Sequence, residues 1–366
     1  LERVRSRSMA MHKSNELLEA GEILFLEMQK LGIESLTAGY VLIDKEEKNG
    51  LNYTPHPGTK KIMPVPVIIP HNETIHMQQV VENWKKGDSF FIVEMDENET
   101  IKHQTFIAER STNFPLSAAE LIAISPAKLF LHNFYFKEGY ILIVGGTKLS
   151  ADQTDIMLRF AKVFQQTYTR FLDLQKAEAQ AREAQIELAL ERVRARAMSM
   201  QHSDHLKDVI EVIGLQLHEM GLFFDYVNFI VGDTTDGLDT WNVSFGQANP
   251  VQFFIPRTDN RVFNETMKAR KDGLEFIAYT LTKEETFHFV THLVTNSILK
   301  YLPEEAIQKR LQAKGMSVST AVLNELFLTM ANYSAIPYTD EENSILKRFG
   351  NAFQQAFTRF LDLQKA

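Results

Sequence analysis

An internal repeat is the feature that most constrains the fold of this chain. LERVRARAMSMQHSDHL at 190–206 nearly repeats LERVRSRSMAMHKSNEL at 1–17, with ten of seventeen positions identical and an offset of 190 − 1 = 189. FQQTYTRFLDLQKA from Phe164 recurs as FQQAFTRFLDLQKA from Phe353, twelve of fourteen identical, with the same offset of 353 − 164 = 189. A period of roughly 190 residues is far longer than a solenoid repeat, so each copy should be a domain with its own core.

The match between the copies is looser in the middle of each unit. IPHNETIHMQQVVENWKKGDSFF from Ile69 aligns with IPRTDNRVFNETMKARKDGLEFI from Ile255 at an offset of 255 − 69 = 186. The change from 189 to 186 and back indicates compensating loop insertions. We therefore expect residues 15–175 to superpose on 204–364 with the same order of elements.

Composition bounds the class of protein. The 366 residues suit two domains, and 44% apolar with 23% charged residues is ordinary for a folded chain. No apolar run approaches the roughly 18 residues that would suggest a membrane span, so we expect no membrane insertion. Zero cysteines exclude disulfides, thiolate metal sites and a thioether-linked bilin, and favour a cytoplasmic location. A net charge of −8 argues against a nucleic-acid partner.

A long helix should join the two copies. No Gly or Pro occurs from Ala151 to Ile213, and the stretch is rich in helix-forming residues. Ser150 with Gln153, and Thr339 with Glu342 in the second copy, have the spacing of capping boxes. We expect one continuous helix from Ser150 to about residue 200. The sequence begins and ends inside this pattern, so further domains are expected before residue 1, after residue 366, or both.

Apolar residues recur along this helix at spacings of three and four, with one shift of phase. Such a stripe is typical of a coiled-coil seam, so we expect a parallel homodimer in which identical residues meet across a two-fold axis. The alternative is that the helix packs on its own domain and only spaces the two copies. The expected seam residues are Phe160, Phe164, Phe171, Leu174, Ala181, Leu188, Leu190, Val193 and Ala197.

Within each copy, short strands alternate with helices and end in a hairpin, which indicates an α+β fold with a sheet flanked by helices. Thr282 with Glu285 is a further capping box. The expected boundaries are the end of an entry helix at 1–13, a first domain at 14–149, the connecting helix at 150–202, a second domain at 203–338 and a truncated exit helix at 339–366.

The segments that enter and leave the copies, LERVRARAM and RFAKVFQQTYTRFLDLQKAEAQAREAQ, resemble those around tandem GAF-like sensory domains of bacterial signalling proteins, particularly multi-domain histidine kinases of the Bacteroidetes. The resemblance implies an antiparallel sheet with helices on both faces. It also implies a role in two-component signal transduction along a dimeric helix. It implies no ligand, because the cyclic-nucleotide signature and the chromophore cysteine of this family are both missing.

No catalytic or cofactor motif is present. The chain lacks a phosphate-binding loop, a serine elbow and a zinc-protease motif. His288 and His292 lie one helical turn apart, but the spacing offers them no third ligand. We therefore expect no metal, no cofactor and no enzymatic activity.

Any ligand pocket should lie on the concave side of a sheet, where aromatic side chains are the candidate lining. The candidates are Trp84, Phe90, Phe106, His132 and Phe134 in the first copy, and Trp241, Phe276, Tyr279 and Tyr333 in the second. The sequence thus predicts a non-catalytic sensory module that dimerises and relays a signal from an unidentified small molecule or partner. The alternatives are a structural or docking array without a ligand, and a small-molecule reductase on the same scaffold.

Overall fold

The computed structural model describes residues 17–55, 62–202, 205–234, 236–244, 250–324 and 326–365. The chain divides into two compact units, unit 1 (Leu1–Gln180) and unit 2 (Ala181–Ala366). The entry helix expected at 1–13 lies outside the described residues.

Unit 1 is built on one antiparallel sheet with strand order β3-β2-β1-β6-β5-β4. Its elements are α2 (Leu17–Lys30), β1 (Thr37–Ile43), β2 (Asn49–Tyr53), β3 (Val67–Pro70), α3 (Ile75–Lys86), β4 (Phe90–Met95), α4 (Glu97–Arg110), α5 (Ala118–Ile124), β5 (Leu129–Phe136), β6 (Gly139–Gly145) and the first part of α6 (Ala151–Met198).

Unit 2 repeats this plan, with strand order β9-β8-β7-β12-β11-β10 in the same direction. The predicted α+β class and tandem repeat are therefore confirmed, as is the antiparallel sheet with helices on both faces that the GAF resemblance implies. After the end of α6 its elements are α7 (Leu206–Glu219), β7 (Tyr226–Asp233), β8 (Gly237–Ser244), β9 (Val251–Pro256), α8 (Arg261–Lys271), β10 (Phe276–Leu281), α9 (Lys283–Asn296), η3 (Ile298–Tyr301), α10 (Glu304–Leu311), β11 (Met316–Val322), β12 (Phe327–Asn332) and α11 (Asp340–Lys365).

Helix starts follow the predicted caps. Ser150 exchanges hydrogen bonds with Gln153, and Thr282 does so with Glu285 at the start of α9. Such caps satisfy N–H groups that a helix cannot pair internally, and each contributes about 1 kcal/mol. The continuous helix expected from Ser150 is confirmed by α6, whose 48 residues carry no break.

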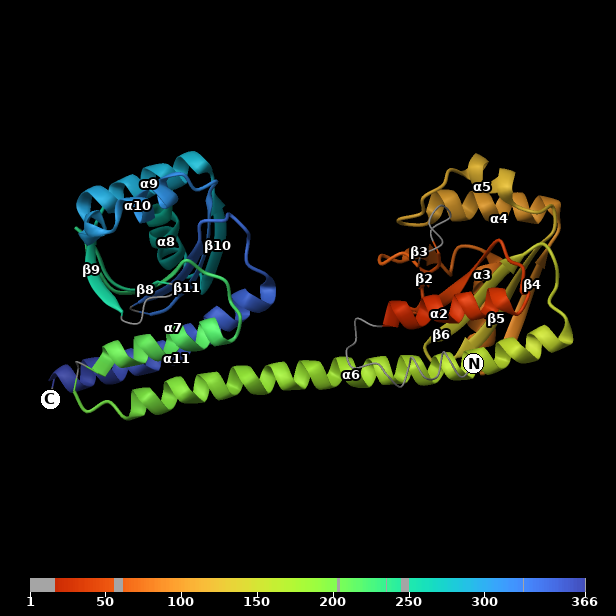
Figure 1. Cartoon of the computed structure of the whole chain (residues 1–366), viewed down its shortest axis with the longest axis horizontal. Coiled ribbons are helices and arrows are strands. Elements are labelled where there is room, and N and C mark those ends of the chain that lie inside the picture. The colour runs from red at the N-terminus through yellow and green to blue at the C-terminus, as the bar shows by residue number, and fades with distance from the viewer. Residues whose placement is uncertain are drawn as a thin grey trace. The chain divides into compact units, whose positions relative to one another are not determined.

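Each sheet has two differently covered faces (Figure 1). In unit 1, α2 and α6 cover one side, here called the α6 face, while α3, α4 and α5 lie on the other, the α4 face. Phe160 and Phe164 of α6 pack on the α6 face against Tyr40 and Phe136. In unit 2, α7, α11 and the end of α6 share a core on one side, and α8 and α9 on the other.

The prediction of a dimer seam is wrong for most of the residues assigned to that seam. Phe160 and Phe164 are buried in the core of unit 1, and Leu190, Val193 and Ala197 are buried in the core of unit 2. Spacing by three and four marks a packed helix face without identifying what packs there, and here the partner is the same chain. The other members of the seam are less covered: Phe171 and Leu174 are half-buried, and Ala181 and Leu188 are exposed.

The phase shift in the apolar pattern has a structural cause. The face of α6 that packs on unit 1 ends near Phe171, and a differently oriented face enters the core of unit 2 from Ile186 onward. Nearly all residues from 173 to 185 are exposed or only half-buried. The helix therefore joins two cores through a solvated middle stretch.

Replacing Phe164 by Ala should lower the free energy of unfolding of unit 1 by about 3–5 kcal/mol, because its fully buried ring fills the α6 face. Urea unfolding checks this in a Trp241→Phe background, where Trp84 is the sole tryptophan. The control Ile75→Ala, at a residue of α3 that is 66% exposed, should change it by less than about 0.5 kcal/mol. A loss for Phe164→Ala that appears only at high protein concentration, where a dimer would form, would instead place this ring in a dimer contact.

Candidate functional site

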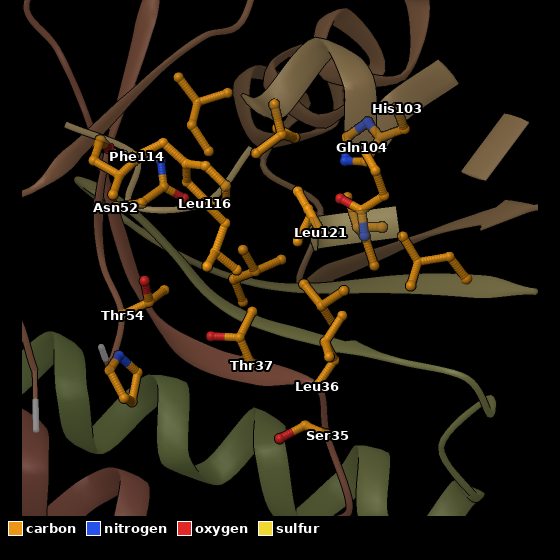
Figure 2. A pocket seen from close by; sticks show the side chains of 18 of the residues that line it. Ser35, Leu36, Thr37, Asn52, Thr54, His103, Gln104, Phe114, Leu116 and Leu121 are labelled. Carbon is orange, nitrogen blue, oxygen red and sulfur yellow. Dashed lines mark hydrogen bonds between the residues drawn. The ribbon is translucent and has the colours of Figure 1, made fainter. Parts of the chain in front are cut away.

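Unit 1 contains a cavity of about 350 Å³ on the α4 face of its sheet (Figure 2). This volume lies at the lower end of the range for small-molecule sites. Most of the wall is apolar and comes from β3, β5, β6, α4 and the segment before α5. The apolar wall includes Val67, Ile69, Met77, Ile107, Phe114, Leu116, Leu121, Leu129, Leu131, Leu142 and Val144.

Polar side chains interrupt this apolar wall at a few points. Asn52, His71, His103 and Gln104 are each less than a tenth exposed, and all line the cavity. Thr37 and Thr54 add hydroxyl groups. Buried polar groups are costly unless they are hydrogen-bonded, so the partners of these side chains decide what the cavity can hold.

Asn52 donates from Nδ2 to the carbonyl oxygens of Gly50 and Val67, at 2.9 Å and 3.3 Å. Because both neighbours are acceptors, the amide nitrogen must lie on that side, and this fixes the orientation of the group. Its Oδ1 has no hydrogen-bond partner among the described residues. Asn52 therefore offers an unused acceptor.

The orientation of the Gln104 side-chain amide, on helix α4, is fixed in the same way. The Ser125 hydroxyl donates to the carbonyl of Leu121 at 2.7 Å, so its oxygen can only accept from Gln104 Nε2, also at 2.7 Å. The Gln104 amide must then hold its nitrogen toward Ser125. Its Oε1 has no partner within the part of the chain that the structure describes.

His71 lies over strand β2, with Nε2 3.1 Å from the hydroxyl of Tyr140. The position depends on Gly50, because a Cβ there would overlap the His71 ring. Burial lowers the pKa of His71 to about 4, and the nearby Asp44 carboxylate only partly opposes this. The ring is therefore neutral at pH 7.

His103 is the second buried imidazole of the cavity. Burial lowers its pKa to about 4, and the neighbouring His76 adds to the shift. Neither of its ring nitrogens has a hydrogen-bond partner in the described residues. Figure 2 shows His103 and Gln104 on one side of the pocket and Asn52 and Thr54 on the other, with Leu116 and Leu121 between.

Among the described residues, no Asp, Glu, Lys or Arg lines this cavity. With both histidines neutral, this described part of the wall carries no formal charge at pH 7. An anion such as a phosphate or a carboxylate would lose its hydration there without gaining a counter-charge.

The pocket residues expected in the first copy lie elsewhere. His132 and Phe134 point to the α6 face, where His132 Nε2 accepts from the backbone N–H of Leu149 just before α6 and Phe134 is in the core. Phe90 is partly exposed and stacks on Phe134, and Phe106 packs in the α4-face core without lining the cavity. Trp84 lines a separate shallow surface hollow and donates to the carbonyl of Phe136.

The error has a simple origin in strand geometry. Successive residues of a strand point to opposite faces, so the choice of His132 over Leu131 selects the wrong side of the sheet. The residues that were missed, Asn52, His71, His103 and Gln104, stand in weak sequence contexts on a short strand, a loop and a helix. A signal was available for two of them in the alignment of the copies, because His103 and Gln104 correspond to Phe289 and Val290.

Equivalent positions in unit 2 can be assigned from N-caps and strand registers. Asp96 and Thr282 are the caps of α4 and α9, so 282 − 96 = 186 relates these helices and places Phe289 at the position of His103 and Val290 at that of Gln104. The same offset relates α3 to α8 through the caps Thr74 and Asn260 and places Phe263 at the position of Met77.

Strand registers give the remaining pairs. Phe253 stands opposite Thr240 in unit 2 as Val67 stands opposite Asn52 in unit 1, and Tyr226 opens β7 as Thr37 opens β1. The larger rings of Tyr226, Phe253, Phe263 and Phe289 belong to one buried cluster on this face. Unit 2 therefore fills with aromatic side chains the space that unit 1 leaves open.

The pocket residues expected in the second copy are part of these packed cores. Tyr279 and Tyr333 pack against the aromatic cluster on the α8 and α9 side. Trp241 and Phe276 pack on the opposite face, with the core that includes α11. All four are filling side chains in unit 2.

The described residues contain no group of three or more His, Cys, Asp or Glu side chains placed to hold a metal ion. Within the same residues, no helix combines the length and the apolar character that a membrane span requires.

Comparison with known proteins gives distant structural similarity. No protein family matches the sequence, and no curated protein matches it. Over 90% of this chain the fold is similar to a bacteriophytochrome from the photosynthetic bacterium R. palustris, with 10% identity and a TM-score of 0.36, and the chain spans 60% of that protein's length. A segment of a methyl-accepting chemotaxis protein is similar over 48% of this chain and 99% of its own length, with 18% identity and a TM-score of 0.30.

The neutral histidines predict a pH dependence of unit 1. Between pH 6.5, the ordinary pKa, and about 4, the unfolded chain binds protons at His71 and His103 that the folded unit excludes. The free energy of unfolding should therefore fall as the pH drops through this window, by up to about 1.4 kcal/mol per pH unit for each histidine. Urea unfolding at pH 7, 6 and 5, followed by Trp84 fluorescence in Trp241→Phe, measures the slope.

The matched variant is His103→Phe with Gln104→Val, which copies Phe289 and Val290 of unit 2. It should remove the His103 share of the slope and leave the contributions of His71 and of the carboxylates. An unchanged slope in this variant would show that His103 is not held neutral by burial.

Proposed function

We propose that this chain is a non-catalytic sensory module in which unit 1 binds a small molecule and α6 passes the resulting change to unit 2 and to an output domain, for which a histidine kinase is the leading candidate. The observation that carries the proposal is the cavity of about 350 Å³, whose buried amides and imidazole have unused hydrogen-bonding capacity. A unit that served only as a spacer would gain stability by filling this space, as unit 2 does.

The strands that line the cavity also support α6. On β6, Tyr140 and Leu142 face the cavity, while Ile141 and Ile143 belong to the core that holds Phe160 and Phe164. A ligand that pushes on Tyr140 therefore acts on a strand that α6 rests upon. Closely packed interiors transmit such displacements because they have little free volume to absorb them.

Unit 2 is assigned the role of relay. Its α8 and α9 face is packed with aromatic rings, and its other face buries Leu190 and Val193 of α6 beside α11. Arg348 of α11 also pairs with Glu183 and Glu187 of α6, at 2.8 Å and 2.6 Å. A rotation or shift of α6 would therefore act on α11, the last helix of the described chain.

Dimerisation remains part of the proposal in a narrower form. Leu174, Ala181 and Leu188 of α6 are spaced by seven residues and are not buried in either core. Seven-residue spacing keeps side chains on one face of a helix and allows two parallel copies to pair along it. We propose that this stretch is the contact of a homodimer.

Two rival functions account for fewer observations. A structural or docking array leaves the polar cavity of unit 1 unexplained. A reductase needs a cofactor and proton-transfer groups, whereas the cavity wall holds neutral, buried imidazoles and amides.

Insertions in the exposed middle of α6 test the relay. The chain is fused after Lys365 to the catalytic region of a histidine kinase, and residues are inserted after Ala179, which lies outside both cores. Four residues turn the downstream helix by about 40° beyond one full turn, and seven leave it about 20° short of two turns. We expect four to change the autophosphorylation rate at least several-fold and seven to leave it close to the parent value.

The seven-residue insertion is the control for length, because it separates the units further than four residues do. Equal effects of both insertions would indicate that helix phase carries no information. No effect of either would favour the spacer function.

The dimer contact is tested by Leu174→Glu combined with Leu188→Glu. Four carboxylates brought to one seam should lower the association constant at least tenfold, measured by light scattering over a concentration series. The control is Leu215→Glu on α7, a residue of similar exposure that lies off this face. A monomer in the parent chain at high micromolar concentration would remove this part of the proposal.

A further inference from the structure

The residues that line the cavity indicate which chemical class of ligand it can bind. Its wall is mostly apolar, its described residues carry no formal charge, and two of its polar places lie on opposite sides in the view (Figure 2). At one place stands Asn52 on β2, and at the other stand His103 and Gln104 on α4. The apolar side chains of Leu116 and Leu121 lie between these two polar places in the view.

Each polar place presents an acceptor. The NH₂ groups of Asn52 and Gln104 are committed to the protein, by the carbonyls of Gly50 and Val67 in one case and by the Ser125 hydroxyl in the other. Both side chains are at least nine-tenths buried. Their oxygens accept no hydrogen bond from the described residues, so a ligand in the cavity can donate to them.

The described part of the wall disfavours anionic ligands. A carboxylate or phosphate entering this space would meet amide oxygens, which repel it, and no cationic side chain among the described lining residues. A hydroxyl or an N–H group would instead donate a hydrogen bond to these oxygens. An apolar scaffold between two such donors would fill the leucine-lined middle.

Resting on the proposed sensory function, we propose that the cavity of unit 1 binds an uncharged, mostly apolar molecule that carries a hydroxyl or N–H donor at each end. One donor meets Oδ1 of Asn52, and the other meets Oε1 of Gln104 or the ring of His103. Unit 2 does not bind this class of molecule, because Phe289 and Val290 replace the polar pair on its helix α9.

Three naphthalenes of one shape separate the elements of the proposal. 2,6-Dihydroxynaphthalene has a donor at each end, 2,6-dimethoxynaphthalene has acceptors only, and naphthalene-2,6-dicarboxylate is charged. Isothermal titration of the full chain at pH 7 should show one site for the diol. We expect the dimethoxy compound to bind at least tenfold more weakly and the dicarboxylate not to bind measurably.

Variants copied from unit 2 locate the site. Asn52→Thr and Gln104→Val should each weaken the diol about tenfold, and His103→Phe with Gln104→Val should abolish binding by filling the space. Tyr168→Phe is the control, because it also copies unit 2, at Phe357, but lies on the α6 face. Trp84 fluorescence in Trp241→Phe confirms that each variant is folded.

The outcomes are distinct. Dicarboxylate binding equal to that of the diol would overturn the uncharged class, and equal binding of the dimethoxy compound would overturn the need for donors. Diol binding that survives the filling variant, or no binding of any of the three at their solubility limits, would also contradict the proposal. If the diol binds as expected and leaves the output of the kinase fusion unchanged, the ligand class stands and the sensory function fails.

Discussion

The alternation of side chains along strands β5 and β6 is the constraint on which the organisation of unit 1 depends. Because neighbouring residues of a strand point to opposite faces, the wall of the cavity and the surface that holds α6 are made from the same seven or eight residues of each strand. Neither face can be repacked without moving the other. The wall of the cavity and the surface that positions α6 therefore share these two strands.

The two copies share one backbone plan but differ in the side chains on one face of the sheet. Strand order and helix caps are the same, yet a histidine and a glutamine on α4 correspond to Phe289 and Val290 on α9. Rings that fill a core gain burial free energy and avoid the cost of desolvated polar groups. Unit 1 carries that cost, and a ligand that supplies the missing hydrogen bonds would offset it.

Much of the fold could be predicted from the sequence because its signals are local or repeated. The offset of 189 found at both ends of the repeat indicated two domains, and caps such as Ser150 and Thr282 located helix starts within a residue. The cavity could not be predicted in the same way. Its residues come from β2, a loop and α4, and the choice between Leu131 and His132 depends on which sheet face a strand residue occupies, which aromatic content does not reveal.

The seam along α6 illustrates a second limit. Periodic apolar residues show that a helix face is covered. They do not show whether a sheet of the same chain or a second copy of the helix covers it. The change of phase near Ile186 was the informative detail, because a coiled coil that continued past it would have needed no new face. Two faces on one helix mean two separate cores, and the stretch between them is buried in neither, although Glu183 near its end pairs with Arg348. Because α6 is one unbroken helix, its backbone directly connects Phe160 and Phe164 in one core with Leu190 and Val193 in the other.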